Sequence, residues 1–311
     1  MPTMRCLPFA ALCLFTLGTS CGAEQETVTV EKLKEQMAKI APLHTRPGKP
    51  QQGDWLARFN EAGQTFDEYV NCTPVKATAK RNKICIQPIG DFDKNQKKVL
   101  DLATEFLGLY YDLPVEFKEP MPLDVVPLEA SRIRNPQKGD LQLLTTYIIE
   151  SVLYPKRPKD AAAYLGFTTT DLWPGEGWNF VFGQALLDGR VGVWSINRFG
   201  DPAKSTASFK LCLLRTMKLA THETGHMFTM EHCTAYMCNM AGTNSLDETD
   251  RHPLWLCPEC MAKVCWMRQV NPVSRYTKLA DFCKKQGFAS EQAFYEKSIE
   301  LLGGPKPQES K

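Results

Sequence analysis

The segment THETGHMFTMEHCTAYMCNM, residues 221–240, holds three of the chain's five histidines, and LCPECMAKVC at 256–265 adds three cysteines soon after. The first segment contains His222-Glu223-x-x-His226 near the end of a long helical pattern, residues 210–228. Five residues at helical spacing predict the buried face of that helix: Leu213, Met217, Ala220, Thr224 and Met227. Because His222 and His226 point away from this face, the helix can present both to a cleft.

The spacing of these histidines predicts a metal site. Residues four apart on a helix lie one above the other, so His222 and His226 can share one zinc ion. Glu223 lies to one side, where its carboxylate can take a proton from a water that zinc makes acidic near neutral pH. His232 follows six residues later and can complete three ligands with one position open. The alternative, a helix with two solvent-facing histidines, fits poorly with the scarcity of histidine elsewhere in the chain.

The cysteines that follow predict a second site. Cys233 and Cys238 form one pair and Cys257 and Cys260 another, and four thiolates in two pairs are the usual ligands of a closed structural zinc site. Two alternatives stay open at this point. Cys257 and Cys260 can form a redox dithiol, and the four cysteines can pair as disulfides.

Composition excludes one class of partner. The chain has 311 residues, 43% hydrophobic and 23% charged, with a formal net charge of +2. These are the values of a globular protein, and no basic face is indicated. Nucleic acid is therefore not an expected partner.

Residues 1–23 are typical of a secretory signal peptide. One arginine precedes the apolar run CLPFAALCLFTLG, which is too short to span a bilayer, and small residues follow. Cleavage after Ala23 would release a soluble protein, whereas cleavage before Cys21 would leave a thiol for lipidation, as in a bacterial lipoprotein. Gly18 stands where that second signal usually has leucine. We expect a secreted or exported protein, with lipidated Cys21 as one route to membrane attachment.

The remaining chain predicts an α+β fold. Residues 24–82 are polar and broken by Pro and Gly, and we expect them to form an extension with short helices at 53–62 and 64–71. From residue 83, strands are predicted at 83–90, 114–121, 161–172, 178–187 and 190–200, and helices at 93–111 and 140–154. Strands and helices that first alternate and then give way to a cluster of strands indicate a mixed sheet. A helix and polar tail are expected at 291–311.

The combined pattern H-E-x-x-H-x5-H-C-x4-C-x-M, followed by C-x2-C, resembles the archaemetzincins, a branch of the metzincin zinc peptidases. Similarity extends over residues 53–282, including 169–185 and 191–199 before the helix. The resemblance implies a catalytic domain at 83–290, with its cleft between 83–232 and 233–290. It also implies two zinc ions per chain. The implied roles are catalytic zinc ligands at His222, His226 and His232, general base at Glu223, Met-turn at Met240, and structural zinc ligands at Cys233, Cys238, Cys257 and Cys260.

Thr229 departs from this family, which has glycine three residues after the second histidine. Glycine lets the chain turn with positive φ towards the third ligand, and a β-branched residue is strained there. We therefore expect that the turn takes another path, or that the helix continues and His232 ligates less well.

The expected function is that of a zinc metallopeptidase for short peptides, with the aminopeptidase-like action that the resemblance implies. One of the strands at 178–187 and 190–200 would form the rim along which an extended substrate binds. The alternative is a catalytically inactive, zinc-stabilised peptide-binding protein. We expect His252 to be a surface residue, Tyr236 to have a packing role, and Cys85, Cys212 and Cys265 to be buried thiols. The sequence does not indicate an oligomeric state.

Overall fold

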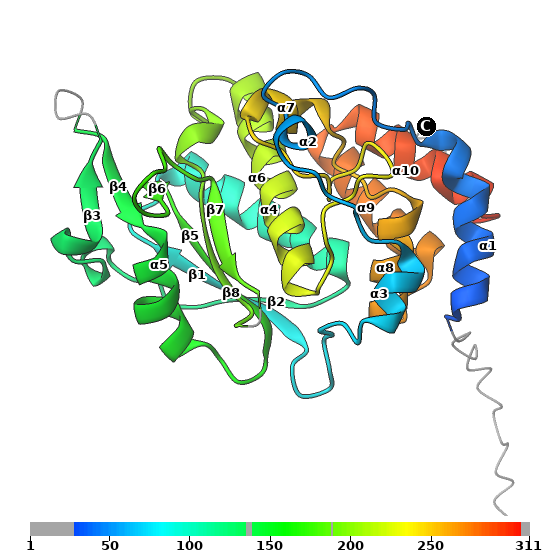
Figure 1. Cartoon of the computed structure of the whole chain (residues 1–311), viewed down its shortest axis with the longest axis horizontal. Coiled ribbons are helices and arrows are strands. Elements are labelled where there is room, and N and C mark those ends of the chain that lie inside the picture. The colour runs from blue at the N-terminus through cyan, green and yellow to red at the C-terminus, as the bar shows by residue number, and fades with distance from the viewer. Residues whose placement is uncertain (1–27, 135–138, 188, 306–311) are drawn as a thin grey trace, which may run out of the picture.

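The computed structural model describes residues 28–134, 139–187 and 189–305, so the predicted leader at 1–23 lies outside the described residues. One part of the molecule is built around a sheet and the other around helices (Figure 1). No helix within the described ranges is long and apolar enough to cross a membrane.

A five-stranded sheet forms the centre, in the order β2-β1-β5-β8-β7. Its strands are β1 (Lys83–Ile89), β2 (Val115–Phe117), β5 (Ala161–Thr168), β7 (Gly183–Leu186) and β8 (Val191–Ser195). The first four in spatial order run parallel, and β7 pairs antiparallel to β8 at the edge. The sheet is therefore mixed, as predicted, and β7 leaves one edge open.

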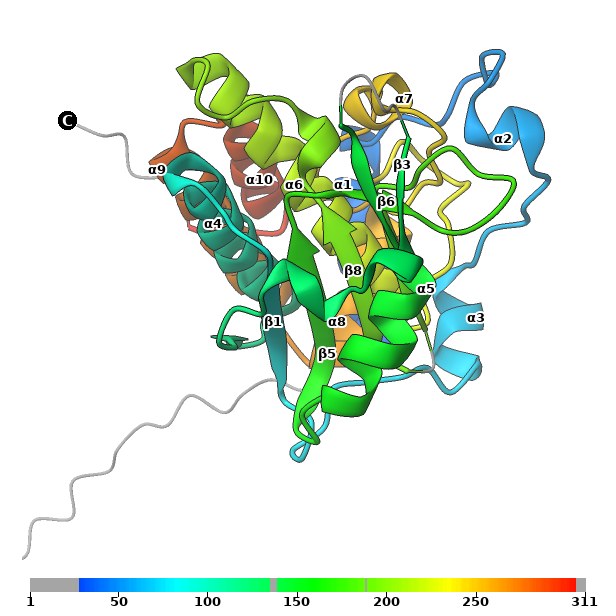
Figure 2. The ribbon, with the colours of Figure 1, turned by 90° about the vertical axis from the view of Figure 1, so that its left-hand side faces the viewer.

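Both faces of this sheet are covered (Figure 2). In β1, Ile84 and Ile86 belong to the larger hydrophobic core, whereas Cys85 and Ile89 belong to a smaller core on the other face. Alternate side chains of a strand point to opposite faces, which explains why β1 and β5 are apolar almost throughout.

The helices α4 (Lys94–Tyr111) and α6 (Thr206–Met227) cover the face with the larger core. The other face carries α5 (Thr145–Tyr147) and the π-helical turn η4 (Ile148–Leu153). A three-stranded sheet adjoins them, with β3 (Ser131–Ile133), β4 (Leu141–Leu144) and β6 (Asp171–Trp173). The predicted helix at 140–154 was wrong for its first residues, because 141–144 pair with β3 and β6.

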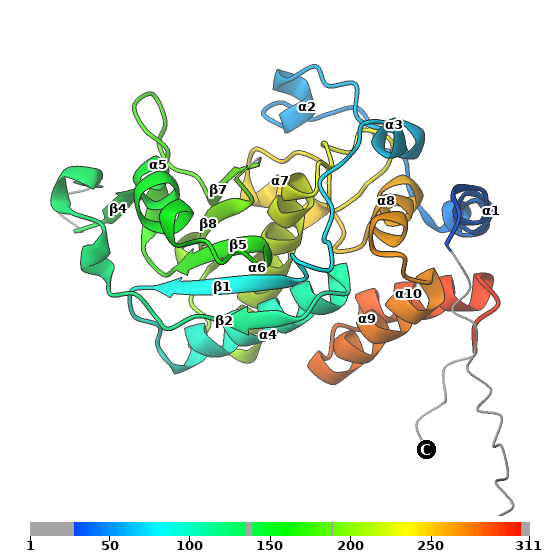
Figure 3. The same ribbon diagram turned by 90° about the horizontal axis from the view of Figure 1, so that it is seen from below.

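The polar N-terminal segment shares the main core. Its helices are α1 (Val30–Ile40), α2 (Trp55–Arg58) and α3 (Phe66–Asn71). Leu33, Met37 and Tyr69 are buried in the same core as α4 and α6. Figure 3 shows α3 beside α8, whereas α2 lies near α7, whose Glu248 accepts the N–H of Trp55.

The C-terminal part is helical. It contains α7 (Leu246–Arg251), α8 (Pro258–Arg268), α9 (Pro272–Gln286) and α10 (Ala289–Leu301). Short 3₁₀ turns complete the described elements: η1 (Ala41–Leu43), η2 (Leu123–Val125), η3 (Leu128–Ala130), η5 (Tyr154–Lys156) and η6 (Asn197–Phe199). The predicted α+β class is confirmed.

Candidate metal centres

Helix α6 presents its histidines as the sequence pattern predicts. All five residues of the predicted apolar face are buried. The other face carries His222 and His226, whose Nε2 atoms lie 3.0 Å apart. Both nitrogens thus converge on one point beside the helix, which is what a shared metal ion requires.

The turn after α6 follows the path of a glycine turn although it contains threonine. The helix ends at Met227, and Thr229 has φ = 65°. The N–H of Thr229 donates to the carbonyl of His226 (2.9 Å), and the N–H of Met230 donates to that of Gly225 (3.1 Å), as in a left-handed helix end. Both backbone paths that we derived from Thr229 are therefore wrong, since the helix stops and the turn reaches His232. The strength of His232 as a ligand stays a prediction.

A hydrogen bond offsets the strain at Thr229. Its hydroxyl accepts the N–H of Val75 (3.0 Å), and its carbonyl accepts the Gln64 side chain (3.2 Å). Positive φ costs a β-branched residue on the order of 1–3 kcal/mol. A hydroxyl that partners an otherwise unpaired N–H recovers about 1 kcal/mol of this. Glycine could not make this bond to the N-terminal segment.

The third histidine completes the cluster. The ring centroid of His232 lies 5.3 Å from that of His222 and 4.8 Å from that of His226. One ligand nitrogen from each of the three lies within 4.8 Å of the others. The structure thus brings together the three residues that the sequence singled out.

The other ring nitrogens have oxygen partners. Nδ1 of His222 lies 2.7 Å from the carbonyl of Asn239, and Nδ1 of His226 lies 2.6 Å from that of Met230. Nδ1 of His232 lies 3.0 Å from the carboxylate of Glu61. An Nδ1–H that donates to oxygen leaves the Nε2 lone pair free for a metal. Burial also lowers the pKa of His222 and His226 to about 4, so the neutral ligand form is favoured. The donor set therefore fits zinc.

Sequence reasoning missed Glu61. It lies in the N-terminal segment, 171 residues from His232, in a stretch with no periodic pattern. The only signal in the sequence was that the resemblance to the archaemetzincins begins at residue 53 and so includes the segment that contains Glu61. The carboxylate–histidine contact shows that this segment supports the metal site.

Glu223 and Met240 lie on different sides of this cluster. Glu223 lines the same cavity as the three histidines, and burial raises the pKa of its carboxyl. Met240 packs beneath the helix at Gly225, where a Cβ would lie only 2.6 Å from the Met240 sulfur. Gly225 therefore allows the methionine to approach the helix backbone between the two histidines.

The four cysteines form a closed, buried cluster. One Sγ from each lies within 4.8 Å of the others, and the side chains are at most 4% exposed. The Sγ atoms of Cys233 and Cys257 are 3.5 Å apart, far longer than a disulfide bond. None of the described cysteines forms a disulfide. Sγ of Cys238 also accepts the N–H groups of Met240 (3.4 Å) and Cys257 (3.2 Å), as hydrogen-bonded metal thiolates do.

A cavity of about 740 Å³ extends from the histidines, a size typical of ligand-binding pockets. One wall is the stretch 177–185, which includes the first three residues of β7, and the other includes Trp55 and Arg58 of α2. The buried carboxylate of Glu248 fixes α2, because it accepts the N–H groups of Trp55 (3.0 Å) and Asn244 (2.6 Å). The inner strand β8 does not line the cavity, so β7 is the rim strand.

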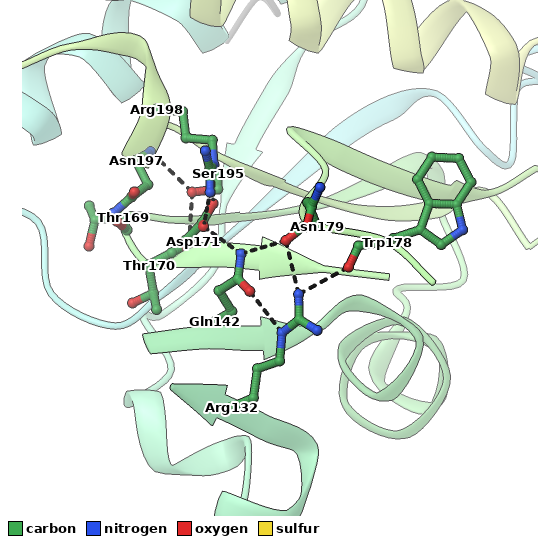
Figure 4. A network of polar contacts seen from close by, with 10 residues as sticks. All are labelled: Arg132, Gln142, Thr169, Thr170, Asp171, Trp178, Asn179, Ser195, Asn197 and Arg198. Atoms are coloured by element: carbon green, nitrogen blue, oxygen red, sulfur yellow. Dashed lines mark hydrogen bonds and ion pairs between the residues drawn. The ribbon is translucent and has the colours of Figure 1, made fainter. Parts of the chain in front are cut away.

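A polar network holds the first wall in place (Figure 4). Arg132 donates to the side chain of Gln142 (2.9 Å) and to the carbonyl of Asn179 (2.9 Å). Gln142 in turn donates to Asp171 (2.7 Å), which forms an ion pair with Arg198 (2.6 Å). Because these residues come from β3, β4, β6 and η6, the network ties the loop before β7 to the small sheet.

The remaining sequence predictions have mixed outcomes. Tyr236 has the expected packing role, with Arg46 stacked 3.9 Å from its ring. Cys85, Cys212 and Cys265 are buried thiols, as predicted. The expectation for His252 was wrong, since it lines the cavity and its Nδ1 is buried. Its loop folds inward because Lys218 of α6 binds the carbonyl of His252 (2.6 Å).

Comparisons with known proteins agree with this site. Residues 162–265 match the model of Peptidase family M54. Archaemetzincin-2 of Rattus norvegicus is 32% identical over 291 residues, which cover 83% of this chain and 80% of the relative. Archaemetzincin-2 of Homo sapiens is 33% identical over 290 residues, covering 83% and 79%. A crystal structure of an archaemetzincin from Methanopyrus kandleri is 27% identical and covers 62% of this chain and 99% of that chain, with a TM-score of 0.49. The chain belongs to the archaemetzincin family, peptidase family M54, and is a zinc metallopeptidase.

Proposed function

We propose that this peptidase hydrolyses short peptides in the cavity beside α6, with His222, His226 and His232 as zinc ligands. The observation that carries the proposal is the convergence of three imidazole nitrogens and Glu223 on one cavity. Zinc held by three imidazoles supplies Lewis acidity, which polarises a peptide carbonyl and makes water acidic near neutral pH.

The protein's own part is to move one proton and to hold the substrate. The Glu223 carboxylate takes a proton from the attacking water and passes it to the nitrogen of the leaving amine, so the proton is conserved. Strand β7 offers an open edge beside the cavity, and an extended peptide can add to it as a further strand.

We further propose that a free amino terminus is preferred. A second cavity, of about 510 Å³, adjoins His226 and His232 and is lined by Glu61 and Glu231. Two carboxylates beside the metal ligands favour a cationic group such as a substrate α-ammonium. The test compares one short peptide with a free and with an acetylated amino terminus. About ten-fold faster cleavage of the free peptide supports aminopeptidase-like action, and equal rates contradict it.

The rival function, an inactive peptide-binding protein, rested on Thr229. That residue adopts the turn expected of glycine, so no observation now favours the rival. Peptide cleavage that disappears in Glu223→Gln supports the enzyme, and wild-type protein inert towards every peptide favours the binder.

We also propose that residues 1–23 direct export. Support comes from the short apolar run and the small residues at 18–23. Mass spectrometry of the mature protein tests this. A chain starting at Glu24 indicates simple cleavage, a lipid-modified Cys21 indicates anchoring, and an intact Met1 contradicts export.

A further inference from the structure

Lys218 lies on the floor of the main cavity, close to the reacting centre. It precedes His222 by four residues on α6, which places it one helical turn, about 6 Å, along the axis on the same face. Lys218 and His222 line the same cavity. A substrate side chain next to the scissile bond can therefore reach the Lys218 ammonium.

This ammonium is buried without a counter-charge. Lys218 is 4% exposed, and its Nζ donates to the carbonyls of Thr249 (2.9 Å) and His252 (2.6 Å). No ion pair of Lys218 occurs within the described residues. The nearby Asp250 is paired with Arg215 instead (2.5 Å). Burying an unpaired charge is costly, so a carboxylate that supplies the third acceptor would be bound strongly.

The lining around Lys218 is positively charged. His252 lies at the same end of the cavity, but its Nδ1 is buried, so this nitrogen does not open to the cavity. Arg58 adds further positive charge to the lining, whose only carboxylate among the described residues is Glu223.

We propose that Lys218 forms a subsite for a carboxylate of the peptide substrate beside the scissile bond. The carboxylate comes from an acidic side chain or from the carboxyl terminus of a short peptide. This inference rests on the proposed peptidase function and specifies its substrate class.

The first experiment compares peptides that differ by single Glu-for-Gln exchanges on either side of the cleaved bond, all amidated at the carboxyl terminus. We expect about ten-fold or greater preference in kcat/KM for Glu at one position, as one charge-assisted hydrogen bond provides. A second set compares a short Gln peptide as free acid and as amide. Preference for Glu assigns the subsite to side chains, and preference for the free acid alone assigns it to the carboxyl terminus. Equal cleavage of all peptides overturns the proposal while leaving the peptidase intact, whereas cleavage of none overturns the proposed function.

Variants test the residues themselves. Lys218→Met keeps the aliphatic length and removes the charge, so the preference should fall to near unity, while Lys218→Arg should retain most of it. Lys204→Met, at an exposed position outside the cavity lining, is the matched control for net charge and should keep the wild-type ratio. Peptide binding to Glu223→Gln protein gives a readout without turnover. There, Glu peptides should bind about ten-fold more tightly than Gln peptides, and equal affinity contradicts the subsite even if Lys218→Met does not fold.

Discussion

The histidine and cysteine clusters adjoin each other in the sequence, at His232 and Cys233, yet their surroundings differ. The histidine rings are partly exposed to two cavities, and oxygen atoms of Asn239, Met230 and Glu61 lie against their Nδ1 atoms. The cysteines are buried in the main core and have backbone N–H donors. Zinc with an open position activates substrates, whereas zinc enclosed by four thiolates contributes folding energy. The same metal thus serves chemistry in one place and stability in the other.

The largest effect expected from this comparison concerns folding. Cys260→Ser removes one thiolate of the closed cluster, and we expect the free energy of unfolding to fall by several kcal/mol, because structural zinc in small domains contributes about 10–16 kcal/mol. Urea unfolding of the zinc-loaded protein measures this. Cys212→Ser, at a buried thiol outside the cluster, should cost only about 1–2 kcal/mol. Equal costs for the two variants would mean that the cluster holds no metal.

The next effect concerns catalysis alone. Glu223→Gln should lower kcat by about 10²- to 10⁴-fold, the range of general acid–base catalysis, with zinc content and thermal stability unchanged. Peptide hydrolysis and metal analysis on the same sample separate these properties. Undiminished turnover would exclude Glu223 as the proton carrier.

A smaller effect tests the support from the N-terminal segment. Glu61→Ala removes the carboxylate from Nδ1 of His232, and catalytic-zinc affinity should fall about 10- to 100-fold. Competition with a chelator measures this affinity. Glu231→Ala removes a carboxylate from the same cavity without a bond to His232 and should leave zinc affinity unchanged. If both variants bind zinc like the wild type, Glu61 does not support the ligand.

The turn at Thr229 should show opposing contributions. Thr229→Val keeps the β-branched shape but leaves the N–H of Val75 without its partner, so unfolding free energy should drop by about 1–3 kcal/mol. Thr229→Gly removes the strain together with the hydrogen bond and should stay within about 1 kcal/mol of wild type. A Val variant as stable as wild type would show that the hydroxyl does not offset the strain.

The smallest expected effect is the pH dependence of thiol labelling, which distinguishes the buried cysteines outside the cluster from the exposed and the cluster cysteines. Burial raises the pKa of Cys85 and Cys212 to about 11, so at pH 8 these thiols are protonated and unreactive. Native protein lacking residues 1–23 should label rapidly at the exposed Cys72, and a chelator should release the four cluster thiols. Labelling of Cys85 or Cys212 should accelerate only as the pH rises towards 11. Rapid labelling of either at pH 8 would contradict their burial.

The sequence predicted the parts of the molecule that depend on local pattern. Helix α6 was predictable because its apolar residues and its histidines both recur at helical spacing, and the two sets lie on opposite faces. Strand β4 was not, because LQLL precedes a helical run and becomes a strand only by pairing with β3 and β6. The Glu61 contact and the inward position of His252 arise from segments that meet only in the folded chain. The path at Thr229 depends on the N–H of Val75, 154 residues away.

The zinc content per chain of protein lacking residues 1–23 tests the two-site account most directly. We predict two zinc ions in the wild type, one in His222→Ala and one in Cys257→Ser. A single zinc in the wild type that persists in His222→Ala and disappears in Cys257→Ser would contradict the account. The histidines would then not form a zinc site in this protein, and the proposed catalytic mechanism would be wrong.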